Sequence, residues 1–243
     1  MRTLVVLPSY NESLNILALI EALLSLGPET TVCLVDDSSP DGTGELVEQA
    51  IRDKAGWKAR VQLITRAKKD GRGGAVRAGF AWGRGSSLGF DAYVEMDCDF
   101  SHEPGAVPIG LQLLAAGNEV VIGARYPDGI IIGWPASRRV FSFLANGLAR
   151  LLISWSIPDY TNGFRFYSPR AVDVLLRHAQ QHKGYIYLSE SLSVLLNAGL
   201  KVATFPIRFK NRQRGVSNTN LAEIGAALKG IFSIAWAHRF PRS

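Results

Sequence analysis

Short apolar runs that end in polar or acidic residues recur along the first part of the chain. Residues 3–7 (TLVVL) lead to a proline, residues 32–35 (VCLV) lead to two aspartates, and residues 61–65 (VQLIT) lead to a basic segment that contains glycine. A fourth run ends at Asp97. Continuous apolar runs of this length, closed by turn-forming residues, are typical of strands buried on both faces. The pattern therefore predicts a series of core strands.

Segments with helical character separate these runs. A cluster of Asn, Glu and Ser predicts a helix that starts near Leu14, residues 38–42 predict a turn before a second helix, and residues 74–82 fit a third. A further strand is expected in the segment EVVIGARY. Strands that alternate with helices in short units predict an α/β fold, with a mostly parallel central sheet and helices on both faces.

Several polar side chains follow directly after the predicted strands. One predicted strand ends at Pro8, which is followed by polar residues, and others end at Asp37, Asp97 and Arg125. In open sheets of this kind, ligands bind beyond the carboxyl ends of the strands. The sequence therefore predicts a binding site along that edge of the sheet.

The segment VEMDCDFSH carries the most specific chemistry in the chain. In an extended backbone Asp97 and Asp99 point to the same side, because alternate residues share a face. Two carboxylates placed in this way can hold one divalent cation, and hard oxygen donors favour Mg²⁺ or Mn²⁺. The pair by itself also fits exposed turn acids at a strand end, so both interpretations stay open at this stage.

Composition limits the class of protein. A chain of 243 residues fits one compact α/β unit with an appended segment. The only cysteines, Cys33 and Cys98, are expected to be free thiols, as in a reducing compartment. The apolar run before Pro8 is too short for a signal peptide, and no stretch reaches the roughly 20 uninterrupted apolar residues of a membrane span.

Two amphipathic segments point to a membrane surface. One is residues 140–157, interrupted by Arg150. The other is the C-terminal segment, where helical spacing places on one face Leu221, Ile224, Leu228, Ile231, Phe232 and Ala235, with Trp236 close to its edge. With a formal charge of +6, such helices suit an anionic lipid surface. Helices packed on the sheet with solvated basic faces are the alternative.

A series of motifs resembles the inverting nucleotide-sugar glycosyltransferases of the A-type (GT-A) fold and, within them, the dolichyl- or polyprenyl-phosphate mannosyltransferases. In order along the chain they are LPSYNE, VDDSSPDGT, MDCDFSHEP, GARY, a GW pair followed by Arg138 and Ser142, DYTNGFRFY, KGYIYLSE and FPIRFKNRQRGVS. The resemblance covers nearly the whole chain. It implies a catalytic domain over residues 1–218 and a C-terminal amphipathic helix over residues 219–243.

The resemblance also implies roles for individual residues. The guanosine part of GDP-mannose would be held by Pro8, Tyr10, Glu12, Val35 and Asp37. The metal and the diphosphate would be bound by Asp97, Cys98 and Asp99, with the two aspartates as metal ligands. Phosphate groups would be bound by Arg125 and Arg212, and the phosphate of the lipid acceptor by Arg138 and Ser142. A guanidinium suits these roles because its rigid donor fork matches phosphate oxygens.

Other positions either stay open or depart from the family pattern. A structural or solvated role is favoured for His102 over a metal ligand, while Asp159 and Glu190 fit equally well a cap or salt bridge and a contact to sugar or acceptor. Departures are Ser101, where relatives often have a better metal ligand, Asn218 in place of a donor-binding Lys, and Arg72 in place of a usual Leu.

The resulting hypothesis is an enzyme, cytoplasmic and peripherally bound to the membrane, that transfers mannose from GDP-mannose to a dolichyl or polyprenyl phosphate with inversion. A small membrane-anchoring subunit is compatible with the sequence. One alternative is a UDP-sugar donor such as UDP-glucose, and another is a non-catalytic nucleotide-sugar-binding or membrane-scaffold protein. Nucleic-acid binding is disfavoured, because few aromatic residues interleave with the basic ones.

Overall fold

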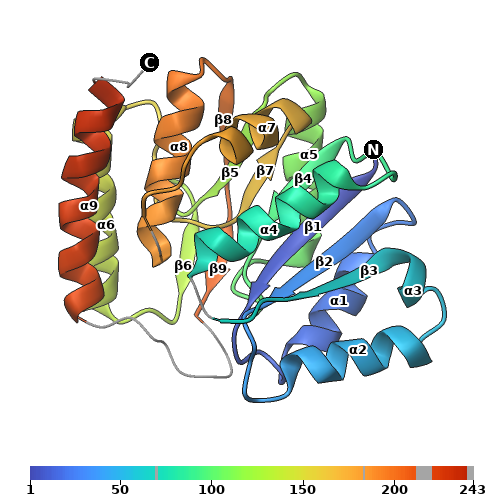
Figure 1. Ribbon diagram of the computed structural model, residues 1–243. Coiled ribbons are helices and arrows are strands. Elements are labelled where there is room, and N and C mark those ends of the chain that lie inside the picture. The colour runs from blue at the N-terminus through green and yellow to red at the C-terminus, as the bar shows by residue number, and fades with distance from the viewer. Residues whose placement is uncertain (69–70, 183, 212–220, 240–243) are drawn as a thin grey trace.

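A single seven-stranded sheet organises the chain (Figure 1). The computed structural model describes residues 1–68, 71–182, 184–211 and 221–239, with side chains for all of these except 185 and 221–229. The spatial order of the strands is β3-β2-β1-β4-β7-β5-β8. Their bounds are β1 Thr3–Ser9, β2 Thr30–Asp36, β3 Val61–Thr65, β4 Ala92–Glu95, β5 Val120–Ala124, β7 Arg165–Tyr167 and β8 Val202–Pro206.

The sheet is mostly parallel, as the sequence predicts. Strand β7 is the exception, because it runs antiparallel to both of its neighbours, β4 and β5. The carboxyl ends of the other strands therefore lie along one edge. A separate parallel pair is formed by β6 (Ile130–Ile132) and β9 (Arg208–Lys210). Along the chain, β6 follows β5 and β9 follows β8.

Helices cover both faces of the sheet and divide the core in two. On one face Val5 and Leu7 of β1 pack with α1, α2, α3 and α5, and on the other Leu4 and Val6 pack with α4, α6, α7, α8 and α9. This alternation follows from the two-residue period of a strand. The bounds are α1 Ile16–Leu24, α2 Thr43–Asp53, α3 Trp57–Arg60, α4 Arg72–Gly85, α5 Val107–Ala115, α6 Ala136–Leu152, α7 Pro169–Arg177, α8 Tyr187–Asn197 and α9 Leu221–Arg239, with short 3₁₀ turns at Pro104–Ala106 and Gly184–Ile186.

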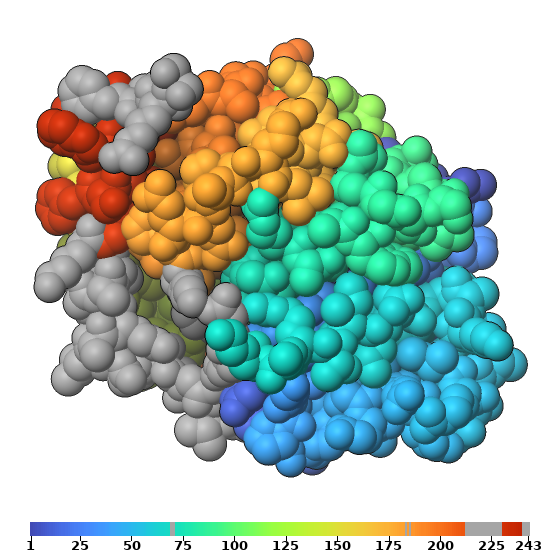
Figure 2. Space-filling view, viewed as in Figure 1, coloured from blue at the N-terminus to red at the C-terminus, as the bar shows by residue number. Residues whose placement is uncertain are grey.

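Glycine spacing explains why α4 lies directly on the sheet. In Figure 2 this helix crosses the visible face, with α2 on one side of it and α7 on the other. A Cβ atom on Gly79 would lie 2.5 Å from Val6 Cγ1, and one on Gly83 would lie 2.4 Å from Leu4 Cδ2. Both glycines are therefore required for this close approach, which carries the N-terminus of α4 to the carboxyl edge of the sheet.

The predicted elements are present, but some of their bounds differ. The first helix begins at Ile16 and not near Leu14, and the helix expected over 74–82 extends from Arg72 to Gly85. The more important correction concerns the acidic motif, because β4 ends at Glu95. Asp97 and Asp99 therefore lie in the loop beyond the strand, and strand alternation does not determine where they point.

Helix α6 has an unusual distribution of side chains. Its buried residues are small or polar, namely Ser142, Ala145, Asn146 and Ala149. Its exposed residues include the large apolar side chains of Val140, Phe143, Leu144 and Leu151. These four share one helical face, because they are spaced by three, four and eleven residues. An apolar stripe on α6 therefore faces away from the core.

Helix α9 packs beside α6 and α8 and contributes Ile231, Ile234 and Ala235 to the buried side (Figure 1). Phe232 and Trp236, which helical spacing places next to Ile231 and Ala235, are 59% and 71% exposed, so the predicted apolar face of α9 is only partly covered. The side chains of Leu221, Ile224 and Leu228 lie outside the described residues. Within the part of the chain that the structure describes, no helix is both long and apolar enough to cross a bilayer.

The predicted division of the chain between residues 218 and 219 falls outside the described residues. Ile234 and Ala235 of α9 belong to the same hydrophobic cluster as the strand residues Leu4 and Val6. A separate C-terminal unit therefore stays a prediction, while the described part of α9 shares the core of the sheet.

Candidate functional site

The loops after β1 and β2 are joined by hydrogen bonds. The backbone N–H of Asn11 donates to Ser39 Oγ at 3.0 Å, and that of Glu12 donates to Thr43 Oγ1 at 3.0 Å. Asn11 and Ser38 both have positive φ, 61° and 53°, which is uncommon outside glycine. Such backbone conformations occur often at ligand sites, where tight loops bring polar groups together.

Four of the five residues predicted to bind guanosine lie on these loops or at the strand ends. Glu12 is buried and accepts a hydrogen bond from Asn15 Nδ2, and Asp37 is buried and forms an ion pair of 3.0 Å with Arg66 Nη1. Pro8 and Tyr10 are partly exposed.

Val35 differs from these four residues, because it is completely buried and a Cβ on Gly79 of α4 would lie 3.3 Å from its side chain. The structure gives Val35 a packing role, and its contact with a nucleotide stays a prediction. Arg66 was not among the residues predicted for the site. It belongs to the basic segment that follows β3, and it pairs with Asp37.

The acidic loop after β4 is folded tightly onto its surroundings. Asp99 Oδ1 accepts the backbone N–H of Ser101 at 3.0 Å, and Cys98 Sγ lies 3.3 Å from the carbonyl oxygen of Pro8. Phe100 has a φ of 58°. Asp99 is 6% exposed and Asp97 is more accessible, with a side chain 21% exposed. The thiol of Cys98 is free, and burial together with the nearby carboxylates raises its pKa.

His102 packs against the buried side of this loop. It is completely buried, its ring stacks on Phe164 at 5.1 Å, its Nδ1 lies 3.3 Å from the backbone N–H of Asp97 and its Nε2 lies 2.8 Å from Asn162 Oδ1. Burial lowers its pKa, against the opposing effect of Asp97. The neutral tautomer with the proton on Nε2 satisfies both contacts, since Nδ1 then accepts and Nε2 donates. The structural role favoured for His102 agrees with this geometry.

An arginine lies directly against the acidic motif. Arg72, the first residue of α4, donates from Nε to Glu95 Oε1 at 2.9 Å and from Nη1 to Asp97 Oδ1. Glu95 was not among the predicted site residues, although a charged residue that closes an apolar strand was a signal for it. The N-terminus of α4 is thus tied to the acidic loop by ion pairs.

The donor set fits a divalent cation that is shared with a substrate. No group of three or more His, Cys, Asp or Glu side chains is arranged to hold a metal within the ranges that the structure describes. Asp97 and Asp99 by themselves could therefore supply carboxylate oxygens for only part of a coordination sphere. Mg²⁺ is commonly bound by one or two carboxylates together with substrate phosphates and water. The two residues fit such an ion.

A second, basic cluster lies at the end of β5. Arg125 donates from Nε and Nη2 to the two carboxylate oxygens of Asp159, both at 2.8 Å, and from Nη2 to Thr161 Oγ1 at 2.6 Å. Arg125 is 5% exposed and Asp159 is completely buried. Burial lowers the pKa of Arg125, but Asp159, with a smaller contribution from Asp97, raises it overall. Asp159 therefore forms a salt bridge, and a direct contact between Arg125 and a phosphate stays a prediction.

Arg138 and Ser142 lie one turn apart on α6 and therefore on the same face of that helix. The Arg138 guanidinium lies 4.1 Å from the ring centre of Trp134, and that of Arg125 lies 5.3 Å from the same ring. Asn146 Nδ2 donates to the carbonyl oxygen of Ser142 at 2.9 Å, and Ser142 is buried. The structure therefore brings two of the predicted phosphate-binding residues, Arg125 and Arg138, together at Trp134, with Ser142 one turn further along α6. Arg212 and Asn218 lie outside the described residues.

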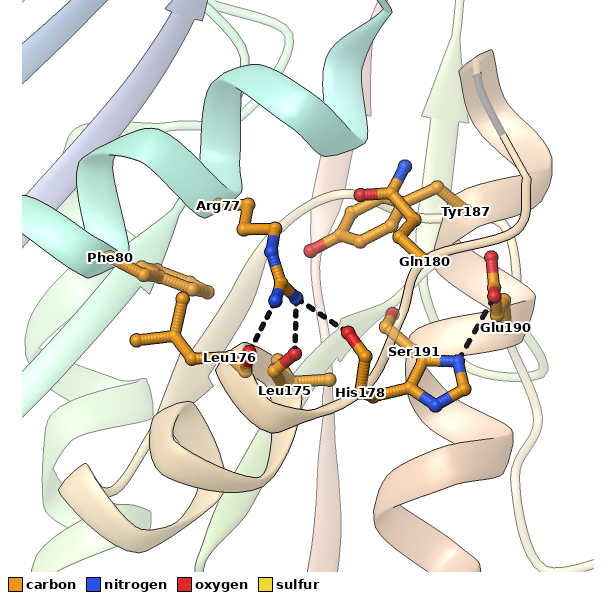
Figure 3. Close-up of a pocket in the computed structure, with 9 residues that line it drawn as sticks. All are labelled: Arg77, Phe80, Leu175, Leu176, His178, Gln180, Tyr187, Glu190 and Ser191. Atoms are coloured by element: carbon orange, nitrogen blue, oxygen red, sulfur yellow. Dashed lines mark hydrogen bonds and ion pairs between the residues drawn. The ribbon is translucent and has the colours of Figure 1, made fainter. Parts of the chain in front are cut away.

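Glu190 lies beside a small cavity between α4, α7 and α8 (Figure 3). Its carboxylate faces His178 Nε2 at 3.1 Å and accepts the backbone N–H groups of Gln181 and His182. Figure 3 also shows Arg77 pointing to the carbonyl groups of Leu175 and Leu176 near the end of α7 and to that of His178 just beyond it. The cavity holds about 20 Å³, room for about one water molecule. Glu190 thus holds the segment between α7 and α8 in place. This agrees with the salt-bridge role that the sequence left open for Glu190.

An open hollow of about 590 Å³ lies between α2 and the β2–β3 edge. Its lining includes Asp36, Ser38, Ser39 and Thr65 at the carboxyl ends of the strands. Neither this hollow nor the small cavity beside Glu190 is lined by Asp97 or Asp99. The candidate site is therefore defined by the arrangement of side chains along the sheet edge and not by either hollow.

Comparison with known proteins identifies the family of this chain. Polyprenol monophosphomannose synthase of Mycolicibacterium smegmatis is 36% identical over 229 residues, which cover 93% of this chain and 84% of that protein. Undecaprenyl-phosphate mannosyltransferase of Micrococcus luteus is 32% identical over 231 residues, 95% of this chain and 93% of that protein. The resemblance drawn from the sequence motifs is thereby confirmed.

Solved structures give the fold. Glucosyl-3-phosphoglycerate synthase from Mycobacterium tuberculosis, in complex with Mn²⁺, UDP and glucosyl-3-phosphoglycerate, matches with a TM-score of 0.68 at 20% identity, over 99% of this chain and 81% of that one. The predicted GT-A fold is confirmed. The profile described as glycosyl transferase family 2 matches residues 4–176. This chain is therefore a glycosyltransferase that belongs to glycosyl transferase family 2.

Proposed function

We propose that this enzyme transfers mannose from GDP-mannose to a polyprenyl or dolichyl phosphate with inversion at the anomeric carbon. The observation that carries the proposal is one edge of the sheet that holds both an acidic pair, Asp97 and Asp99, and a basic cluster at Arg125 and Arg138. The names of the two relatives at 36% and 32% identity support mannose as the sugar and a polyprenyl phosphate as the acceptor.

The chemistry needs little from the protein besides positioning and charge. A phosphate monoester has a second pKa of about 6, so the lipid phosphate is already largely ionised at neutral pH and needs no strong general base. Arg125, Arg138 and Ser142 would orient this nucleophile, and Glu12 and Asp37 would hold the nucleoside. A divalent cation, Mg²⁺ or Mn²⁺, bound by Asp97 and Asp99 would supply charge stabilisation for the departing diphosphate.

The donor is tested by direct competition. Purified enzyme is given equal amounts of GDP-mannose and UDP-glucose, each with its sugar labelled differently, together with a short polyprenyl phosphate and Mn²⁺. We expect mannosyl phospholipid as the main product. Turnover of UDP-glucose alone would reject the mannosyl assignment, and the absence of product with either donor, while nucleotide still binds, would favour a non-catalytic binding protein.

The exposed apolar side chains of α6 and α9 support a position on the cytoplasmic membrane surface. Phe143 is 63%, Leu144 62% and Trp236 71% exposed, on two helices that pack side by side. Aromatic and aliphatic side chains with nearby basic residues suit the interface of an anionic bilayer. A peripheral location of this kind would bring the enzyme to its lipid acceptor, with or without a small anchoring subunit.

Replacing two of these side chains should weaken membrane binding. The variant Phe143→Glu with Leu144→Glu is expected to lower binding to anionic liposomes by at least about tenfold, since each large apolar side chain contributes about 1.5–3 kcal/mol when buried. Binding is measured by liposome flotation. Ile109→Glu, on α5 and also exposed, is the matched control and should float as the unmodified protein does. Equal flotation of both variants would remove α6 from the membrane interface.

A further inference from the structure

Arg72 reaches the acidic motif with three of its nitrogen atoms. Nε donates to Glu95 Oε1 at 2.9 Å, Nη1 donates to Asp97 Oδ1, and Nη2 donates to the carbonyl oxygen of Gly163 at 3.2 Å. The side chain is only 13% exposed. A guanidinium held at three points, two of them buried groups, has a fixed position, unlike a solvated surface arginine.

The partners of Arg72 show that this position is built into the fold. Glu95 is completely buried, and its second oxygen accepts the hydroxyl of Tyr167 at 3.0 Å. On the other side, a Cβ on Gly163 would lie 2.5 Å from Arg72 Nη2 and 2.9 Å from Cζ. Gly163 therefore leaves the space that the guanidinium occupies. Strand β4, the loop before β7 and the first turn of α4 together enclose the guanidinium of Arg72.

The consequence concerns Asp97. A divalent ion bound between Asp97 and Asp99 needs carboxylate oxygens, and Oδ1 of Asp97 is already paired with Arg72. A cation next to a carboxylate stabilises its charge and at the same time repels a second cation. We infer that Arg72 is a positioning residue of the metal site: it holds Asp97 in place and competes with the divalent cation for that carboxylate.

Charge balance supports this role. Glu95, Asp97 and Asp99 contribute three negative charges, and Arg72 contributes one positive charge. Arg72 offsets part of this negative charge, so the same carboxylates without Arg72 would attract a divalent ion more strongly. The enzyme alone should therefore bind metal weakly, and the diphosphate oxygens of the donor would supply the missing ligands. The inference deepens the proposed function and depends on its metal site.

The test measures metal binding directly and without turnover. The double variant Arg72→Leu with Glu95→Gln removes the cation and also the buried charge that it neutralises, so that the fold is spared an unpaired carboxylate. Glu95→Gln alone is the matched variant, because Arg72 then still holds Asp97. A second control is Arg84→Leu, which removes another carboxylate-paired arginine from the exposed end of α4. Binding of Mn²⁺ is followed by the electron paramagnetic resonance signal of the free ion, with and without GDP.

Without GDP, we expect the double variant to bind Mn²⁺ at least about tenfold more tightly than Glu95→Gln, in line with the effect of a neighbouring opposite charge on a carboxylate. Adding Asp97→Asn to the double variant should abolish the gain, which assigns it to Asp97. Thermal denaturation is used to check that the double variant and Glu95→Gln are both folded. If the two folded variants bind Mn²⁺ with equal affinity while the enzyme still transfers sugar with Mn²⁺, the inference about Arg72 is overturned and the proposed function is not. No binding by any form, even with GDP, would reject the metal site as well.

Discussion

Asp99→Asn is expected to lower the rate of mannose transfer by about 10³-fold, the upper range for loss of one preorganised charge-stabilising contact. Asp99 is 6% exposed, and its Oδ1 accepts the backbone N–H of Ser101 at 3.0 Å. The amide oxygen of the substituted residue can accept the same hydrogen bond, so the loop should keep its shape. What is lost is a negative charge at the proposed metal position.

The measurement is the kcat for transfer of labelled mannose from GDP-mannose to a short polyprenyl phosphate at saturating Mn²⁺. Asp53→Asn, which neutralises an exposed carboxylate in the last turn of α2, is the matched control and should retain full activity. Thermal denaturation shows whether both variants are folded. Retention of more than about a tenth of the activity by folded Asp99→Asn would exclude this carboxylate from the charge stabilisation that the mechanism requires.

Asp159→Ala is expected to cost about 3–5 kcal/mol of unfolding free energy, because it leaves the buried guanidinium of Arg125 without its carboxylate. Both side chains are almost inaccessible, and two hydrogen bonds of 2.8 Å join them. Asp159 also accepts the backbone N–H of Arg125 at 3.0 Å, so the end of β5 depends on the same carboxylate. Urea denaturation gives the free energy.

The exposed pair of Arg84 and Asp173 provides a matched control. It has the same two-point geometry, with distances of 2.7 and 2.9 Å, but its side chains are each 37% exposed. Asp173→Ala should therefore cost no more than about 1 kcal/mol. Similar losses in the two alanine variants would mean that burial does not distinguish the pairs, and that Arg125 is not anchored as the structure indicates.

The parts of the fold that depend on local pattern could be predicted from the sequence. The runs at residues 3–7, 32–35 and 61–65 all lie in strands. The first two are buried on both faces and therefore need continuous apolar residues, whereas the third is the partly exposed edge strand β3. The motifs also placed the chain in its family. Bounds were less accurate at β4, where Met96 is buried but lies beyond the strand end at Glu95.

Contacts between distant parts of the chain could not be predicted in this way. The pairing of Arg72 with Asp97 and that of Arg125 with Asp159 join residues 25 and 34 positions apart. The sequence offered Arg72 only as a departure from the family pattern and Asp159 only as a polar residue in an apolar segment. Which cation meets which carboxylate depends on how α4 and β5 are packed, and no local pattern contains that information.

Sequence alone thus determined the α/β class, the mostly parallel sheet and the family, since each follows from patterns and motifs of residues that are neighbours along the chain. Tertiary structure decided the reversed direction of β7, the outward apolar face of α6 and the partners of the charged residues. The physical reason is that burial of a charge or an apolar face depends on the surfaces that surround it, and these are defined only when the whole sheet and its helices are assembled.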